Sequence, residues 1–243
     1  MKIGIFSDIH SNTEGLSAVL EGLRDAGASS FVCLGDLVGY GPEPNEVVET
    51  IRSLHCPCIM GNHDKAAFDA GERQVFNPYA RSAIEWTANR LTAENLDYLK
   101  GLPMSHSQDG ALYVHASPHE PKAWHYVDRP EQYKLAFAGL NGHPLCFIGH
   151  THRPSIVVQD PKGHYYPHSS RSVDLIPGFR YIVNDGSSGQ SRDGLTLAGC
   201  ALYDTEAQTV ELMRVPYDVE ATRRKIRDAG LPTFLEERLA HGI

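Results

Sequence analysis

The stretch that decides the fold is Lys2-Ile3-Gly4-Ile5-Phe6-Ser7-Asp8-Ile9-His10. Its first residues form a short apolar run of strand length, and the run is followed by a carboxylate and an imidazole. From Thr13 to Ala26 the apolar residues recur at helical spacing, and Gly27 ends the pattern. The chain therefore begins with a strand, a polar turn and a helix, which is the unit from which parallel sheets are built.

The same alternation continues along the chain. Residues 31–34 read as a second apolar strand, 45–54 as a second helix and 58–60 as a third strand. This order predicts a parallel, doubly wound half-sheet. A polar cluster follows each of these strands: Ser7-Asp8, Gly35-Asp36 and Gly61-Asn62-His63-Asp64. Because ligands bind where the carboxyl ends of such strands meet, the three clusters are expected to share one crevice.

The rest of the chain predicts one domain over residues 1–243. Residues 66–101 form a helical excursion, with helices at 78–90 and 93–100. Strands at 112–114 and 145–148 then return the chain to the crevice, at His115 and at Gly149-His150. Beyond Arg153 we expect strands that form a second sheet, and then two helices: 156–159, 164–166, 180–183, 196–203 and 209–215, followed by 218–229 and 232–239.

Composition excludes several classes of function. The formal net charge of -8 argues against nucleic acid or an anionic membrane as a standing partner, because either needs a basic face. No apolar run approaches the roughly 20 residues of a membrane span, and the start of the chain does not resemble a signal peptide. Five cysteines without disulfide-like spacing fit a reducing compartment. We therefore expect a cytoplasmic protein that acts on small substrates, with its oligomeric state left open.

The polar clusters contain seven candidate metal ligands. Each has an ordinary alternative when taken alone: an aspartate caps a helix, Gly-Asn forms a turn, and a histidine packs in a core. Their joint occurrence after strands that converge on one crevice favours metal binding. Oxygen and imidazole ligands without a thiolate suit manganese, iron, zinc or nickel. The candidates are Asp8, His10, Asp36, Asn62, His115, His150 and His152.

Charge points to the kind of substrate. A single carboxylate can offer one oxygen to each of two ions, and Asp36 is the best candidate for this bridge. Two divalent cations (+4) against two carboxylates (-2) leave a charge of +2. An anionic phosphoryl group would compensate this positive charge, so the substrate is expected to carry one.

The motifs D-x-H, G-D, G-N-H-D, H and G-H-x-H, in this order, resemble those of the calcineurin-like metallophosphoesterases, and the resemblance covers most of the chain. Residues 38–47, 114–118 and 214–218 are similar to a bacterial and archaeal branch of small, phosphodiesterase-like proteins that is largely uncharacterised. The resemblance implies an α/β fold of the metallo-dependent phosphatase type. Its architecture is a four-layer α/β/β/α sandwich, with two packed mixed sheets flanked by helices.

The resemblance also implies roles for the site residues. It assigns Asp8, His10, Asp36 and His152 to one metal, and it assigns Asn62, His115, His150 and the shared Asp36 to the other. It implies that a hydroxide bridging the two ions attacks phosphorus in line. His63 is then expected to protonate the leaving oxygen, with Asp64 orienting or tuning its imidazole.

One departure from the family pattern affects the expected substrate. Protein serine/threonine phosphatases and diadenosine tetraphosphate hydrolases of this superfamily carry an arginine in a G-D-x-V-x-R-G segment, where this chain has Gly39-Tyr40-Gly41. Losing a guanidinium removes a strong phosphate clamp and favours phosphodiesters or other small phosphoesters. Asn12, Tyr40 and Arg192 are candidates for contacting substrate. For Arg192 a structural ion pair with Asp185 or Asp193 is the favoured alternative.

The leading interpretation is a dinuclear metal-dependent phosphoesterase that hydrolyses small phosphodiesters. A phosphomonoesterase or a serine/threonine phosphoprotein phosphatase is the first alternative. A second alternative is a protein-interaction scaffold of the same fold, as a retromer subunit is. Degenerate ligands would indicate the scaffold, and none of the seven is degenerate here.

Overall fold

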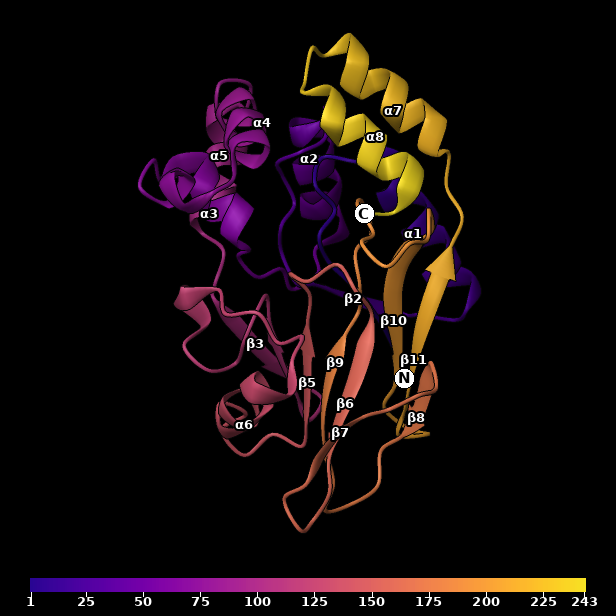
Figure 1. Ribbon diagram of the computed structural model, residues 1–243. Coiled ribbons are helices and arrows are strands. Elements are labelled where there is room, and N and C mark those ends of the chain that lie inside the picture. The colour runs from indigo at the N-terminus through magenta and orange to yellow at the C-terminus, as the bar shows by residue number, and fades with distance from the viewer.

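The computed structural model describes residues 1–243 and contains two sheets with helices on their outer faces (Figure 1). The first sheet has the strand order β2-β1-β10-β11-β8, and the second has β3-β4-β5-β9-β6-β7. The strands are β1 (Lys2–Phe6), β2 (Ser30–Cys33), β3 (Ser105–Gln108), β4 (Ala111–Val114), β5 (Leu145–Ile148), β6 (Ser155–Gln159), β7 (Tyr165–Pro167), β8 (Ser172–Asp174), β9 (Arg180–Asn184), β10 (Ala198–Asp204) and β11 (Thr209–Val215).

Eight α-helices and two short 3-10 helices accompany the sheets. They are α1 (Thr13–Asp25), α2 (Pro44–Leu54), α3 (Asn62–Phe68), η1 (Glu72–Val75), α4 (Pro78–Ala88), α5 (Ala93–Lys100), η2 (Pro121–Ala123), α6 (Pro130–Ala138), α7 (Val219–Asp228) and α8 (Thr233–His241). None of these helices combines the length and apolar character needed to cross a bilayer.

The alternation of side chains along β1 explains the layers. Ile3 and Ile5 are buried in the core between the two sheets, whereas Phe6 packs with α1 and α2 on the other face. On the outer face of the second sheet, Tyr133 and Phe137 of α6 form a separate core cluster. Each fully buried side chain of this size contributes about 1.5–3 kcal/mol. The order is helix, sheet, sheet, helix, so the predicted four-layer sandwich is confirmed.

The course of the sheets differs from the sequence-based prediction in two respects. β1 pairs with β2 in parallel, as the alternation of strands and helices predicted, but its other edge pairs with β10 in antiparallel orientation, so this sheet is mixed, as the family resemblance implied. The strands beyond Arg153 also do not form a sheet of their own. β8, β10 and β11 complete the first sheet, whereas β6, β7 and β9 complete the second. A buried strand such as β1 needs hydrogen-bonding partners on both edges, and β10 supplies the missing one.

Smaller differences concern short elements. The predicted strand at 58–60 is reduced to one parallel bridge between Cys33 and Cys58. The helical excursion starts earlier than residue 66, because α3 already begins at Asn62. Two strands, β3 and β8, and the helix α6 were not predicted. β3 is a polar edge strand of alternating half-buried and exposed residues, so it carries no apolar signal.

Candidate metal centre

The seven predicted ligands come together at one end of the two sheets. Asp8 and Asp36 lie just beyond β1 and β2 of the first sheet, whereas His115 and His150 directly follow or nearly follow β4 and β5 of the second. Three groups of side chains could each hold a metal ion, with ligand atoms within 4.8 Å of one another: Asp8, His10 and His152; Asp36, His115 and His150; and a third group, His10, Asp36 and His63, which shares a residue with each of the other two. Asn62 joins the second group, because its Oδ1 lies 3.2 Å from His115 Nε2.

The backbone is strained where these ligands lie. Five of the seven have a positive φ, between 50° and 67°: Asp8, His10, Asp36, His150 and His152. For residues other than glycine this left-handed conformation costs about 1–3 kcal/mol each. Strain of this kind does not help folding, and it clusters at sites where side chains must be aimed at a target.

Two glycines allow the ligands to approach one another. A Cβ atom at Gly61 would collide with the carboxylate of Asp36, and one at Gly149 would collide with the carboxylate of Asp8. Any larger residue at either position would therefore displace a ligand. This explains why glycine precedes Asn62 and His150 in the motifs.

Main-chain carbonyl groups fix the tautomers of three histidines. His10, His115 and His152 each place Nδ1 2.5–3.0 Å from a backbone oxygen, and a carbonyl oxygen can only accept a hydrogen bond. Each Nδ1 therefore carries a hydrogen and donates it. In the neutral ring Nε2 is left with a lone pair, which is the form that binds a metal.

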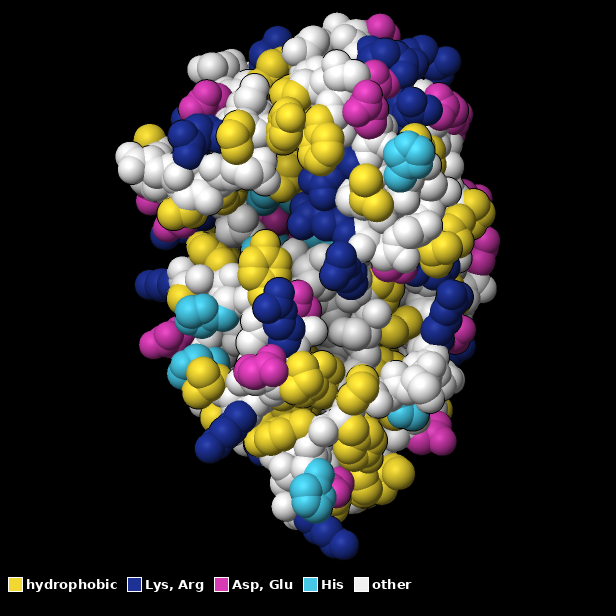
Figure 2. All heavy atoms as spheres, in the orientation of Figure 1, with side chains coloured by type: hydrophobic (Ala, Val, Ile, Leu, Met, Phe, Trp, Pro, Cys, Tyr) yellow, Lys and Arg dark blue, Asp and Glu magenta, His cyan; other side chains and the backbone are white.

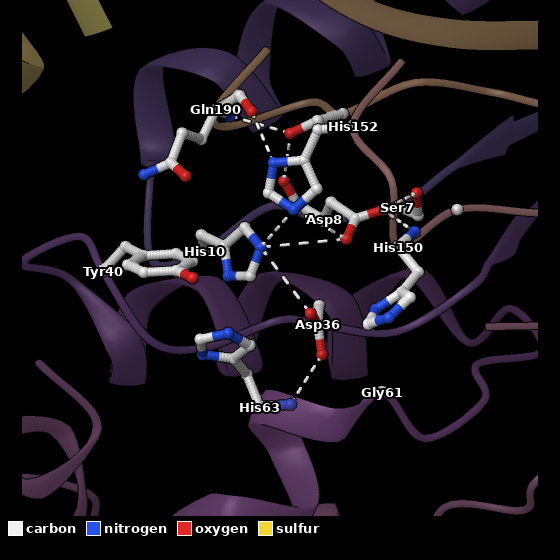
Figure 3. Close-up of polar contacts among 12 residues, drawn as sticks. Ser7, Asp8, His10, Asp36, Tyr40, Gly61, His63, His150, His152 and Gln190 are labelled. Atoms are coloured by element: carbon white, nitrogen blue, oxygen red, sulfur yellow. Dashed lines mark hydrogen bonds and ion pairs between the residues drawn. The ribbon is translucent and has the colours of Figure 1, made fainter. Parts of the chain in front are cut away.

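These lone pairs point at other acceptors (Figure 3). His10 Nε2 lies 3.1 Å from His152 Nε2, and His152 Nε2 lies 3.2 Å from Asp8 Oδ1. The Asp8 Oδ1 and His150 Nε2 atoms are buried and have no hydrogen-bond partner. Buried acceptors that face one another repel unless a cation lies between them. The donor set therefore fits a metal.

The pKa values of the histidines agree with this geometry. Burial lowers the pKa of His150 to about 3, and it also lowers the pKa of His10 and His152, so these rings are neutral at neutral pH. At His115 burial also lowers the pKa, but the carboxylate of Asp36 outweighs it and raises the pKa to about 10. The gap between His115 Nε2 and Asp36 Oδ2, 3.4 Å, thus holds a proton that a metal would displace.

A cavity of about 400 Å³ opens onto the centre. Figure 2 shows a hollow in this face, with Lys and Arg side chains gathered in it and apolar side chains at its rim. The candidate ligands Asp36, Asn62, His150 and His152 line the cavity, together with His63, Tyr40 and Arg192. Its apolar side is formed by Phe76, Trp124 and Tyr126. The cavity therefore provides room for a substrate larger than phosphate itself.

Tyr40 and Arg192, two of the predicted substrate contacts, lie side by side in this cavity. Arg192 Nη2 is 3.4 Å from the Tyr40 hydroxyl and 3.1 Å from Gln190 Oε1. The favoured alternative for Arg192 is wrong, because Asp193 pairs with Arg214 and Asp185 is not among the acids paired with an arginine. Arg192 is therefore free to meet a bound anion.

Asn12, the third predicted substrate contact, does not line the cavity. Its side chain is buried and caps α1, where Oδ1 accepts a hydrogen bond from the Gly15 N–H at 2.9 Å. Its Nδ2 donates to the Gly189 carbonyl at 2.8 Å. These bonds engage both ends of the amide, so the structure does not support a substrate contact by Asn12.

His63 lies in the cavity beside the ligands. Its ring packs against those of Tyr40, Phe76 and His10, with centroids 4.5–4.8 Å apart, and its buried Nδ1 has no partner. Burial lowers the pKa of His63 to about 4, and the charge of Arg192 lowers it further. The free ring is therefore neutral at neutral pH.

The structure does not place the carboxylate of Asp64 against the imidazole of His63. Its two carboxylate oxygens do not contact the His63 ring, but accept hydrogen bonds from four backbone N–H groups at 2.8–3.3 Å, among them those of Asp36 and Gly61. Asp64 is fully buried. It therefore fixes the backbone that carries Asp36, rather than the imidazole of its neighbour.

Two further residues, Ser7 and Asp185, were missed by sequence reasoning. Ser7 Oγ lies 2.5 Å from Asp8 Oδ2 and 2.8 Å from Asp185 Oδ1. A hydroxyl has one hydrogen, so it can donate to only one of these carboxyl groups and must accept from the other. The only sequence signal was the place of each residue directly after a strand.

The proton belongs on Asp185. Burial raises the pKa of Asp185 well above its usual range, and the charge of Asp8 adds to this effect. Neutral Asp185 then donates to Ser7, and Ser7 donates to Asp8 Oδ2, which also accepts from the His150 N–H at 2.9 Å. Asp8 Oδ2 is thereby occupied, and Oδ1 is left to face the two histidines.

Comparison with known proteins agrees with this site. A family model described as calcineurin-like phosphoesterase matches residues 1–154. The chain belongs to the calcineurin-like phosphoesterase family. The matched segment contains all seven candidate ligands, whereas Arg192 and the last two helices lie beyond it.

Relatives cover the whole chain. The chain is 37% identical to "Uncharacterized protein MJ0912" of Methanocaldococcus jannaschii, over 99% of this chain and 98% of that protein. The crystal structure of a metallophosphoesterase from Sphaerobacter thermophilus is 40% identical and superposes with a TM-score of 0.87 over 100% of both chains. Hypothetical protein PH1004 from Pyrococcus horikoshii OT3 shares the fold, with 22% identity and a TM-score of 0.78 over 100% of this chain and 98% of that one.

The role of Asp64 predicts the effect of Asp64→Asn. The amide replaces one acceptor oxygen with a donor that faces backbone N–H groups, so we expect the free energy of unfolding to fall by about 2 kcal/mol or more. Chemical denaturation followed by circular dichroism measures this value. Asp69→Asn, just after the same helix, serves as the matched control and should change stability little. Equal stability of the two variants would contradict the assigned role.

The proton on Asp185 predicts a contrast between two substitutions. In Asp185→Asn the amide is neutral and can still donate to Ser7, so manganese affinity should stay within a few-fold of the parent protein. In Asp185→Ala the relay is lost, and we expect the affinity to fall about 10–100-fold. Titration calorimetry with Mn²⁺ compares the two. If Asp185→Asn is as impaired as Asp185→Ala, Asp185 acts as a carboxylate and the assignment is wrong.

Proposed function

We propose that this protein hydrolyses small phosphodiesters with the help of two divalent transition-metal ions, manganese, iron, zinc or nickel. The observation that carries the proposal is the convergence of buried, unpaired acceptors around Asp36. When bound, the ions supply a hydroxide nucleophile and neutralise charge on the phosphoryl oxygens. Family membership supports the reaction class.

The proposed ligand sets follow two of the three groups of side chains, and His63 of the third group is assigned to the leaving group. Asp8, His10 and His152 would hold one ion, and Asn62, His115 and His150 would hold the other. Asp36 would be shared by both ions, since its Oδ2 lies 3.6 Å from His10 Nε2 in the first group and 3.4 Å from His115 Nε2 in the second. The His63 N–H donates to Asp36 Oδ1 at 2.8 Å and keeps the carboxylate in this orientation.

The shape of the cavity favours a diester over a monoester. Beyond the ligands, the lining continues along the apolar side chains of Phe76, Trp124 and Tyr126. A monoester would place its single ester arm there, whereas a diester has a second arm that needs such a surface. Phosphomonoesterase activity is the second candidate, because Arg192 also suits a dianionic phosphate. The intact ligand set disfavours a scaffold without catalysis.

His63 is proposed to assist the leaving group. Its ring lies in the cavity, next to His10, and its neutral form at neutral pH can donate one N–H hydrogen bond. The negative charge of a bound phosphoryl group raises the pKa of the ring and favours the protonated form. His63 would then transfer its proton to the departing oxygen.

The proposed activity predicts manganese-dependent hydrolysis of bis-p-nitrophenyl phosphate, with a higher kcat/KM than for p-nitrophenyl phosphate. Asp36→Asn should lower kcat/KM at least about 100-fold, because it weakens the ligand shared by both ions. Asp25→Asn, which removes an exposed carboxylate, is the matched control. A preference for the monoester would support the second candidate. Absence of hydrolysis of either ester with any of the four metals would contradict the proposal.

The proposed role of His63 predicts a dependence on the leaving group. His63→Ala should slow diphenyl phosphate, whose phenolate leaves poorly, by about 10²–10⁴-fold. Bis-p-nitrophenyl phosphate, whose leaving group departs without a proton, should be slowed far less. Steady-state kinetics give both ratios, and metal analysis of the variant checks that both ions are retained. Equal losses on the two esters would rule out proton donation.

A further inference from the structure

We propose that Arg192, Arg238 and Tyr40 form a second anion subsite, which binds a second phosphate group of the substrate. The proposal rests on the function proposed above, since the phosphate that is hydrolysed lies at the metal centre. The three residues come from separate places: Tyr40 precedes α2, Arg192 follows β9, and Arg238 belongs to α8. Both arginines lie outside the segment matched by the family model.

The two guanidinium groups converge on one aromatic ring. The guanidinium carbon of Arg192 lies 5.7 Å from the centroid of Tyr40, and that of Arg238 lies 5.8 Å from it. The same ring lies edge-on to His10, with centroids 4.7 Å apart. The cations are therefore one ring away from the metal ligands, and Tyr40 is the spacer between the two subsites.

Neither guanidinium is paired with a side-chain carboxylate. Arg192 and Arg238 take part in none of the ion pairs of the structure, and nearby acids are paired elsewhere, Asp193 with Arg214 and Glu236 with Arg227. Arg192 Nε is buried without a hydrogen-bond partner. Arg238 Nε donates to a main-chain oxygen of Ile243 at 2.7 Å, so this bond does not engage the two terminal nitrogens.

The two positive charges act on each other. Burial lowers the pKa of Arg238 to about 10, and the charge of Arg192 contributes to this shift. Arg238 still carries its charge at neutral pH. Holding two like charges together in a partly buried place is unfavourable unless an anion joins them. A phosphate suits this place, because a guanidinium fork can donate two hydrogen bonds to its oxygens.

The sum of charges also favours a substrate with a second phosphate group. Two divalent ions (+4), the carboxylates of Asp8 and Asp36 (-2) and a hydroxide (-1) leave +1 at the metal centre. Arg192 and Arg238 raise the total to +3. A diester with one phosphate brings only -1, whereas a diester that also carries a terminal phosphate (-2) brings -3. Arg192 lines the cavity, and Figure 2 shows Lys and Arg side chains gathered in the hollow of this face.

The test compares two esters that differ only in the second phosphate. Thymidine 5′-(p-nitrophenyl phosphate) has one phosphate, and its 3′-phosphorylated form has two, with the same leaving group. We expect the parent protein, loaded with manganese, to prefer the 3′-phosphorylated ester about tenfold in kcat/KM, mainly through KM. In Arg238→Met, which removes the guanidinium that lies 5.4 Å from the Phe234 ring centroid but keeps a long side chain, the preference should fall to about twofold or less. Arg192→Met should have the same effect.

Arg224→Met is the matched control, because it removes an exposed charge from the neighbouring helix α7 and should leave the preference unchanged. Equal kcat/KM for the two esters in the parent protein would overturn the subsite, as would an undiminished preference in Arg238→Met. If neither ester is hydrolysed, the proposed function is contradicted.

The subsite is then tested by ligand binding alone. Calorimetry should show tighter binding of thymidine 3′,5′-bisphosphate than of thymidine 5′-phosphate, and Arg238→Met should abolish the difference. Equal affinities would refute the subsite.

Discussion

The metal centre depends on nitrogen and oxygen lone pairs that face one another and repel. Backbone carbonyl groups hold the Nδ1 hydrogens of His10 and His152, which turns the two Nε2 lone pairs toward each other and toward Asp8. In a buried, low-dielectric place this arrangement is unfavourable without a cation. Folding therefore builds a site that metal binding stabilises, and the strained backbone around it is tolerated for the same reason.

The four-layer fold brings these acceptor atoms together. Asp8 and Asp36 come from one sheet, whereas His115 and His150 come from the other, so the packing of two sheets sets the distance between ligand groups. Supporting residues then lock individual groups. Asp64 holds the backbone around Asp36, and the chain from Asp185 through Ser7 fixes which oxygen Asp8 presents. These residues act through the ligands and need not touch substrate.

Sequence reasoning predicted what local pattern and chemistry determine. The first strands, the flanking helices and the grouping of ligands such as Asp8 and His150 follow from apolar spacing and from polar residues at strand ends. It failed where the answer depends on contacts between distant segments. The pairing of β10 with β1, the bond from Asp185 to Ser7 and the approach of Arg192 to Tyr40 each join residues more than 150 positions apart. The backbone contacts of Asp64 were likewise not predicted, because sequence neighbours at the start of a helix need not face each other.

Two metal ions are proposed to lie on either side of Asp36. The most direct measurement is the anomalous scattering of crystals grown with Mn²⁺, recorded at the manganese absorption edge. The account predicts two peaks on either side of the Asp36 carboxylate, one within bonding distance of Asp8, His10 and His152, and the other of Asn62, His115 and His150. A single peak, or peaks outside these two groups of side chains, would contradict it.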